Sequence, residues 1–219
     1  MSERTIKKVV YLVRHGESKD NVAPVFQSPD SPLSERGLQQ AERIAERVSK
    51  LTFDALVASP FLRAKETAAA IGRTTRKEPE YSEFFVERIK PTGIYGKAYD
   101  DEEANSVWRK WEKSLYTPEL RVEDGENFTD IIERADKALD FLTSRPEQSI
   151  VVVTHGYFLR TMVARVLFVD LLTGELHRSF QRHADHENTG LTVLRYHGGF
   201  EEESSWHLWM YNDHAHLGE

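Results

Sequence analysis

The stretch Val9-Val-Tyr-Leu-Val-Arg-His-Gly-Glu17 decides the fold. Its first five residues are apolar and do not alternate with polar ones, which predicts a strand buried on both faces of a sheet. The apolar run ends abruptly at Arg14, His15 and Gly16. A glycine at this place permits the tight turn that leads out of a strand, so the arginine and histidine should lie at the strand's carboxyl end.

Two later segments repeat this order of a short apolar strand, polar residues and a helix. Ala55–Ala58 is followed by Ser59-Pro60, and a proline in the first helical position predicts a helix that runs to about Gly72. The third strand is Ile150-Val-Val-Val-Thr154, and the helix that starts after His155-Gly156 carries an apolar stripe.

The remaining elements complete a strand and helix alternation. Ser34 should cap a helix whose buried stripe is Leu38, Ala41, Ile44, Ala45 and Val48. A helix is expected from about Asn127 to Thr143, and two late strands, 191–196 and 206–211, flank a turn at Gly198-Gly199. The alternation predicts an α/β fold with three layers, in which helices cover both faces of a mostly parallel central sheet.

Residues 79–126 interrupt this alternation. The segment is rich in charged and aromatic residues, and a short helix in it places Val107, Trp108, Trp111 and Leu115 on one face. We expect an insertion beside the active site that covers the pocket, because the segment is too short for a core of its own. Residues 1–219 should therefore form a single domain.

Composition excludes several classes of function. Lys and Arg number 29 against 36 Asp and Glu, so the net charge is 29 − 36 = −7, which argues against a nucleic-acid partner. The chain has no cysteine, which excludes disulfides, thiolate nucleophiles and Cys-based zinc sites. The apolar run Val9–Val13 is too short for a signal peptide or a membrane span. We expect a cytoplasmic protein without a membrane partner, and the sequence indicates no oligomeric state.

The polar residues after the three strands predict the site. In an open α/β sheet, ligands bind outside the carboxyl ends of the strands, so Arg14, His15, Arg63 and His155 should come together there. Arginine guanidiniums match phosphate oxygens, and nearby helix N-termini also favour an anion. Neutral imidazole is available near neutral pH. In a chain without cysteine, histidine is the best nucleophile for a phosphoryl group.

Other groups of polar residues predict less. His183 to His186 and Asp213 to His216 contain residue types that bind zinc, but neither has the spacing of a known zinc motif. We expect these to be solvated loops and predict no metal site. The acidic run 100–103 is expected to be a solvated helix N-terminus, and Trp108 and Trp111 are expected to pack a helix on a core rather than cover a substrate.

Four motifs resemble those of the histidine phosphatase superfamily, also called phosphoglycerate mutase-like. These are Leu12-Val-Arg-His-Gly-Glu-Ser18, Pro32-Leu-Ser-Glu-Arg-Gly37, Ala58-Ser-Pro-Phe-Leu-Arg-Ala-Lys-Glu-Thr67 and Val153-Thr-His-Gly156, in the family's order and within residues 8 to 167. The resemblance implies that His15 takes the phosphoryl group. It also implies that Arg14, Arg63 and His155 hold the phosphoryl oxygens, with help from Asn21 and the N–H of Gly156.

A carboxylic acid must protonate the leaving group in such a reaction. Val86-Glu87-Arg88 resembles the Glu-Arg step of the mutases, so Glu87 is the predicted acid, and Glu83 is its rival. After Glu87 the sequence reads Ile89-Lys-Pro-Thr-Gly93, which departs from the family's Gly-rich pattern.

These observations predict a phosphomonoester hydrolase that works through phosphohistidine on His15, without metal or cofactor, on a small phosphorylated substrate. One alternative is a cofactor-primed phosphoglycerate mutase that uses the same pocket, although Val22-Ala-Pro-Val-Phe26 is unlike the mutase pattern at that place. A weaker alternative is a non-catalytic module that binds a phosphorylated ligand. Such a module would not need the nucleophile.

Overall fold

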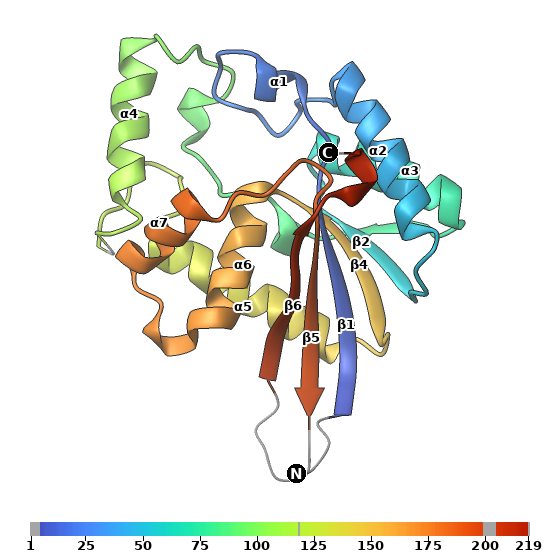
Figure 1. Cartoon of the computed structure of the whole chain (residues 1–219). Helices are drawn as coiled ribbons and strands as arrows, with labels where there is room; N and C mark the ends of the chain where they lie inside the picture. The colour runs from blue at the N-terminus through green and yellow to red at the C-terminus, as the bar shows by residue number, and fades with distance from the viewer. Residues whose placement is uncertain (1–4, 118, 199–204, 219) are drawn as a thin grey trace.

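The computed structural model describes residues 5–117, 119–198 and 205–218. Its centre is a six-stranded sheet of order β3-β2-β4-β1-β5-β6 (Figure 1). The first four strands in this order are parallel, and β5 pairs antiparallel with both β1 and β6. The strands are β1 (Thr5–Arg14), β2 (Ala55–Ala58), β3 (Pro79–Tyr81), β4 (Ser149–Thr154), β5 (Leu191–Gly198) and β6 (Ser205–Asp213). The predicted mostly parallel sheet is confirmed.

Helices cover both faces of this sheet and confirm the three layers. On one face α2 and α3 pack against β2, β4 and the end of β1, and on the other face α5 and α6 pack against the same strands. Helix α7 lies against α6. The helices are α1 (Lys19–Val22), α2 (Glu35–Val48), α3 (Leu62–Thr75), α4 (Glu102–Lys113), α5 (Phe128–Ser144), α6 (Gly156–Phe168) and α7 (Gly174–His183).

The register of the parallel strands places the polar strand ends side by side. Arg14, the last residue of β1, pairs with Thr154, the last residue of β4, and on the other side of β4 Ala58 pairs with Val153. The ladder continues one residue further, because the N–H of His15 donates to the carbonyl of Thr154 at 2.9 Å. His15, Ser59 and His155 therefore emerge at one edge of the sheet.

Two local predictions were wrong. Helix α3 begins at Leu62 rather than at Pro60, because Ser59 stays in the sheet through a 2.9 Å hydrogen bond to Val153 and Phe61 remains extended. In α2 the predicted stripe includes Leu38, but Leu38 is 51% exposed. Gln40 is buried in its place, since its side-chain oxygen accepts from the N–H of Glu17 at 2.8 Å.

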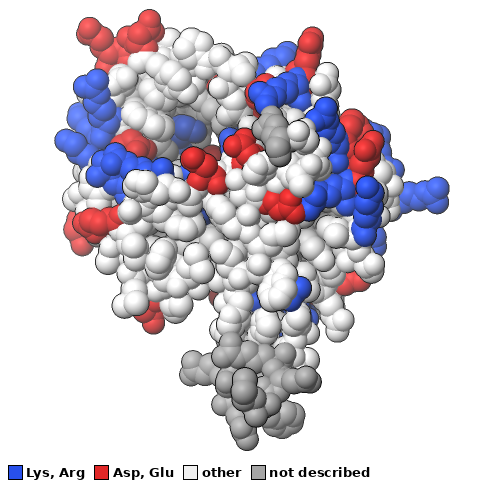
Figure 2. All heavy atoms as spheres, viewed as in Figure 1, with Lys and Arg blue, Asp and Glu red and all other residues white. Residues whose placement is uncertain are grey.

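The predicted insertion at 79–126 begins later than expected. Pro79–Tyr81 is strand β3, which pairs with β2 in the central sheet, so only residues 82–126 lie outside it. This segment is joined to residues 23–27, where the N–H of Phe26 donates to the carbonyl of Lys97 at 2.8 Å. A small third core holds Phe26, Ile94 and Ala104 together. We call residues 23–27 and 82–126 the roof, and Figure 2 shows a hollow between α4 and α1.

Two further expectations concern the ends of the sheet and the membrane. The predicted Gly198-Gly199 turn falls partly outside the described residues, because Gly199 is not among them. Within the described ranges, no helix has both the length and the apolar character needed to cross a bilayer.

A buried histidine fixes α7 against α6. His177 is fully buried, and its Nε2 lies 2.9 Å from the hydroxyl of Thr161 on α6. Burial, followed by the positive charges of Arg88 and Arg160, lowers the pKa of His177 to about 3. The folded protein therefore holds this imidazole neutral at pH values where a solvated histidine is charged.

This difference makes stability depend on pH. Because the pKa of His177 is about 3 in the folded state and about 6.5 in a solvated chain, the unfolded state takes the proton first. The stability that neutral His177 contributes is fully present above about pH 6.5, and it is lost as the pH falls from there toward about 3. The unfolding free energy of the parent protein should fall between pH 8 and pH 5. In His177→Gln this fall should be smaller by about 2 kcal/mol, as measured by urea unfolding at both pH values.

The control is His183→Gln, which alters an exposed histidine on the same helix. It should retain the pH dependence of the parent protein. Equal slopes for His177→Gln and the parent would show that another group carries the acid sensitivity.

Candidate active site

His15 has a defined proton arrangement at the end of β1. Its Nδ1 lies 2.6 Å from the carbonyl oxygen of Gly16, which can only accept, so Nδ1 carries the hydrogen. On the other side of the ring, Nε of Arg63 donates to Nε2 at 3.1 Å. An arginine can only donate, so Nε2 holds the lone pair. His15 is therefore a neutral imidazole whose nucleophilic nitrogen faces an arginine.

Arg63 is held as rigidly as the histidine it contacts. It lies in the first turn of α3, is 1% exposed, and donates from Nη1 to the carbonyl of Ser28 at 2.9 Å. Thr67, one turn later, accepts from the N–H of Gly16 at 3.1 Å and donates to the carbonyl of Arg63 at 2.8 Å. One helix turn thus fixes both the arginine and the loop that carries His15.

His155 packs directly against His15. The two ring centroids are 4.9 Å apart and the rings meet edge to face. Nε2 of His155 lies 2.7 Å from the hydroxyl of Ser59. Its Nδ1 is buried and has no hydrogen-bond partner among the described residues. A buried polar atom left in this state costs about 1–3 kcal/mol, which a bound polar ligand would recover.

Arg14 reaches the same place because Gly156 has no side chain. A Cβ at Gly156 would lie 2.9 Å from Nε of Arg14, so any other residue would displace the guanidinium. Nη1 of Arg14 donates to the carbonyl of His186, and its Nε is buried without a partner in the described part of the chain. Gly156 is also the first residue of α6, where backbone N–H groups favour an anion.

The site is strongly cationic and dry. Burial, then the charges of Arg63 and Arg14, lowers the pKa of His15 well below its ordinary value of 6.5. His155 is shifted in the same direction by burial and by Arg63. Burial lowers the pKa of Arg63 to about 10, which still leaves it charged at neutral pH. Two neutral imidazoles thus lie in the field of two guanidinium ions, those of the buried Arg63 and the partly buried Arg14.

Glu87 enters this cluster from the roof. Its carboxylate accepts hydrogen bonds from the N–H groups of Tyr157 at 3.2 Å and Phe158 at 3.0 Å, in the first turn of α6. Burial lowers the pKa values of Arg14 and Arg63, and the negative charge of Glu87 opposes that shift in both. Its rival, Glu83, is exposed on a short 3-10 helix (Glu83–Phe85). Of the two glutamates, only Glu87 is placed to reach the predicted pocket.

An arginine from α5 fixes the strand of chain that carries Glu87. Arg134 donates to the carbonyls of Phe84 at 3.1 Å, Val86 at 2.9 Å and Glu87 at 3.3 Å. Its Nε and Nη2 make a two-pronged ion pair with Glu126, both contacts at 2.7 Å. Such forked pairs define orientation as well as distance. Arg134 thereby ties the Glu87 segment to α5 of the main domain, while the neighbouring Arg88 donates to the carbonyls of Trp111 and Glu126 in the rest of the roof.

Asn21 lies at the margin of the cluster. Its side-chain oxygen accepts from the N–H of Ser18 at 2.9 Å and forms a capping box at α1. The structure therefore brings together six of the seven predicted site residues, namely Arg14, His15, Arg63, Glu87, His155 and Gly156. Asn21 instead lines an adjoining cavity.

Sequence reasoning missed three residues around the cluster. Ser59 follows β2, so the strand-end argument could have found it. The side chain of Asn188 donates to the carbonyl of His15 at 2.9 Å, and only its place before a glycine hinted at a turn. No sequence pattern indicated that Lys90 belongs to the site. Burial lowers the pKa of Lys90 to about 8, and Glu87 and Arg63 are among the charges that act on it.

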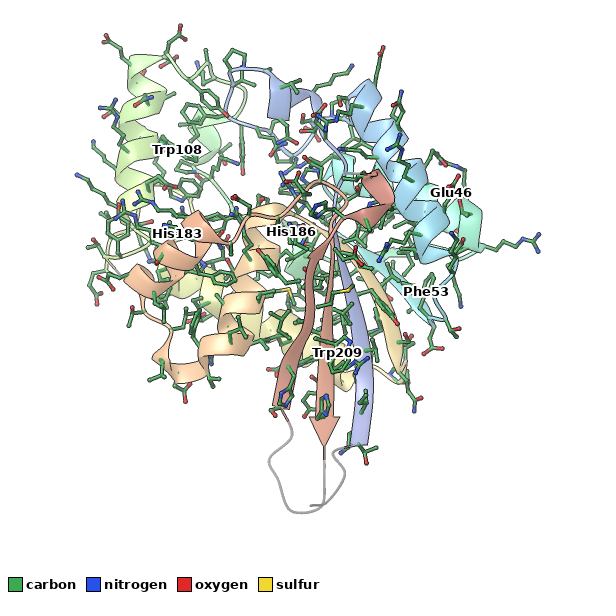
Figure 3. The ribbon with its side chains drawn as sticks, in the orientation of Figure 1. Glu46, Phe53, Trp108, His183, His186 and Trp209 are labelled. Carbon is green, nitrogen blue, oxygen red and sulfur yellow. The ribbon has the colours of Figure 1, made fainter. Side chains whose placement is uncertain are left out.

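The histidines and aspartates that could have bound zinc do not form a metal site in the described residues. His186 is buried, with Nε2 at 2.9 Å from the hydroxyl of Thr192, whereas His183 is exposed on α7 (Figure 3). In the ranges that the structure covers, no three His, Asp or Glu side chains are grouped so that they could hold a metal ion. Asp101 caps α4, as expected of a helix N-terminus. Trp111 packs in the roof, but Trp108 also lines the cavity beside Asn21.

Comparison with known proteins gives relatives over most of the chain. The chain is 34% identical over 166 residues to a probable phosphoglycerate mutase GpmB of Proteus mirabilis, covering 72% of this chain and 74% of that protein. It is 29% identical over 214 residues to the protein of the same name from Yersinia pestis, covering 95% and 94%.

Solved structures share the fold. The structure of Bacillus stearothermophilus YhfR superposes with a TM-score of 0.77 at 28% identity, covering 96% of this chain and 99% of that one. A phosphoserine phosphatase from Entamoeba histolytica superposes with a TM-score of 0.73 at 24% identity, covering 96% and 99%. The model of the histidine phosphatase superfamily (branch 1) matches residues 10–208, and the chain belongs to that superfamily.

Proposed function

We propose that this chain is a phosphomonoester hydrolase that carries the phosphoryl group on Nε2 of His15. The observation that supports this most directly is the proton arrangement of His15. Its Nδ1–H is held by the carbonyl of Gly16, which leaves the Nε2 lone pair facing Arg63. Burial among arginines keeps that nitrogen neutral. An anionic phosphoryl group would be drawn to the same arginines and would bring phosphorus to the lone pair.

The cluster can stabilise the charge that develops during transfer. Arg14 and Arg63 offer guanidinium donors to the phosphoryl oxygens, and Gly156 offers the N–H at the start of α6. The unpartnered polar atoms on Arg14 and His155 are available for the same purpose. These groups supply positive charge without a bound metal. They act as fixed donors, which is the main source of catalysis in phosphoryl transfer.

Glu87 completes both half-reactions. In the first, Nε2 of His15 forms a bond to phosphorus, the bond from phosphorus to the ester oxygen breaks, and protonated Glu87 gives its proton to the leaving alkoxide. In the second, Glu87 takes a proton from water, the water oxygen bonds to phosphorus, and the bond to Nε2 breaks. Inorganic phosphate leaves, and His15 regains its lone pair.

The nucleophile is tested by trapping the phosphoenzyme. Wild-type protein that is quenched during turnover of a labelled monoester should carry acid-labile phosphate on His15, identified by peptide mass spectrometry. His15→Ala should form no phosphoenzyme and lose at least about a hundredfold in kcat, since removing a nucleophile costs at least this much. A variant that folds and keeps more than a hundredth of the rate would exclude covalent catalysis by His15.

The acid is tested by its dependence on the leaving group. Glu87→Gln should slow hydrolysis of alkyl phosphates by roughly 10²–10⁴-fold, because their alkoxide needs a proton as the bond breaks. The first step with p-nitrophenyl phosphate should be spared, since its leaving group is stable as an anion, and phosphoenzyme should then accumulate in a rapid-quench experiment.

The matched control is Glu83→Gln, four residues earlier and exposed. It should leave both classes of ester unchanged. The reverse pattern, in which Glu83→Gln alone shows the leaving-group dependence, would reassign the acid and leave the role of His15 intact.

A second candidate is a phosphoglycerate mutase, the activity for which the relatives from Proteus mirabilis and Yersinia pestis are named. A mutase shields phosphohistidine from water and returns the group to a second hydroxyl, whereas a hydrolase admits water. The two are separated by following 3-phosphoglycerate with and without the bisphosphate primer. Steady release of inorganic phosphate from several monoesters supports the hydrolase. Rapid formation of 2-phosphoglycerate with negligible phosphate release supports the mutase.

A further inference from the structure

A cavity of about 430 Å³ adjoins the catalytic cluster under the roof. Its size is within the range of about 300–1,000 Å³ that small-molecule sites occupy. In Figure 2 basic side chains are visible inside the hollow between α4 and α1. The cavity lies next to the cluster, because Arg63 donates to the carbonyl of Ser28 at 2.9 Å and the preceding residue, Gln27, lines the cavity. Its lining residues are Asp20, Asn21, Phe26, Gln27, Lys90, Tyr99, Asn105 and Trp108.

One wall of the cavity is aromatic. The ring of Phe26 lies 4.9 Å from that of Tyr99 and 5.1 Å from that of Trp108. Phe26 is almost fully buried, whereas Tyr99 is 48% exposed, so the outer rings face the cavity space. In Figure 3 Trp108 lies on the side of α4 that faces the rest of the molecule. This wall offers a flat apolar surface to part of a ligand.

The other lining residues are mostly polar, and several have a donor or an acceptor without a partner among the described residues. Asn105 uses its amide nitrogen on the carbonyl of Tyr99, which leaves its oxygen. Asn21 uses its oxygen on Ser18, which leaves its amide nitrogen. Asp20 accepts the N–H of Ser28 through one oxygen only.

Lys90 is the least satisfied group in this lining. Its nearest acceptor is the carbonyl of Gln27 at 3.5 Å, and no described carboxylate lies within the 4.0 Å of an ion pair. Lys90 and Asp20 are the charged lining residues, one of each sign. A second strongly anionic group would therefore meet a carboxylate as well as the ammonium, whereas hydroxyl groups can donate to one and accept from the other.

We propose that this cavity binds the alcohol part of the substrate and that this part is a polyhydroxylated ring, as in a sugar phosphate. Such a ring has flat faces of C–H groups, which match the wall of Tyr99 and Trp108, and an edge of hydroxyls, which match Asp20, Lys90 and Asn105. An acyclic ester would leave the aromatic wall uncovered. The inference rests on the proposed hydrolysis at His15 and names the substrate class of that same site.

The test is selectivity among esters. The value of kcat/KM for glucose 6-phosphate and ribose 5-phosphate should exceed that for ethyl phosphate and 3-phosphoglycerate by at least about tenfold, since ring contacts and hydrogen bonds each contribute on the order of 1 kcal/mol. Trp108→Leu keeps an apolar side chain in the roof core but removes the flat ring. It should lower the ratio of kcat/KM for glucose 6-phosphate to that for ethyl phosphate roughly tenfold.

The matched control is Trp209→Ala, which removes an exposed tryptophan on β6, far from Trp108 in Figure 3. Its selectivity ratio should equal that of the parent. A collapse of the roof in Trp108→Leu would lower both rates together and leave the ratio unchanged. An unchanged ratio in a variant with native circular dichroism overturns the proposal. A preference for 3-phosphoglycerate over both sugar phosphates also overturns it and assigns Lys90 to a carboxylate.

Binding provides a readout that does not depend on turnover. Calorimetry on His15→Ala should show that glucose 6-phosphate binds at least about tenfold more tightly than ethyl phosphate. If the wild-type protein does not hydrolyse these esters but His15→Ala still binds glucose 6-phosphate more tightly, the ring site is supported and the proposed function fails. If His15 carries out hydrolysis but both esters bind equally well, the proposed function stands and the ring site is overturned.

Discussion

The rest of the active site depends on the parallel pairing of β1 with β4. Because Arg14 is opposite Thr154, the next residue of each strand is a histidine at the same level of the sheet. A shift of the register by one residue would turn one of the two side chains to the other face. The buried apolar runs of both strands fix this register, and packing thereby places His15 and His155 in ring contact at 4.9 Å.

The second constraint is the burial of positive charge. An uncompensated cation is costly where it is shielded from solvent, and burial lowers the pKa values of Arg14 and Arg63. The negative charge of Glu87 opposes that shift in both. Glu87 is itself stabilised by the N–H groups of α6. The same cations keep His15 neutral. The site is therefore arranged so that an added anion improves the electrostatic balance, whereas a proton on His15 worsens it.

Local sequence was enough to predict five of the six strands and the residues at their ends, because each follows directly from an apolar run and a turn. It missed the short edge strand β3 (Pro79–Tyr81), which lacks an apolar run. The sequence-based predictions failed where the position of a side chain depends on a contact with a residue far away in the sequence. Gln40 of α2 is buried and accepts from the N–H of Glu17, whereas Leu38 is 51% exposed. Glu87 is placed beside the catalytic cluster by the first turn of α6 and by Arg134, whereas Glu83 is exposed, and no pattern near residue 87 reveals these contacts. The resemblance of Val86-Glu87-Arg88 to the family motif favoured Glu87, but it gave no information about where the side chain lies.

The two halves of the site belong to different parts of the chain. The groups that we propose for the phosphoryl oxygens come from strand ends and helix starts of the main domain, where displacement would disturb the core. The lining of the adjoining cavity comes mostly from the roof and the loop after β1, whose own core is the small cluster around Phe26. Substitutions there can alter the cavity without loss of the fold. Glu87 lies at the boundary between the two, because Arg134 ties its backbone to α5 while the neighbouring Arg88 donates to Trp111 and Glu126 of the roof.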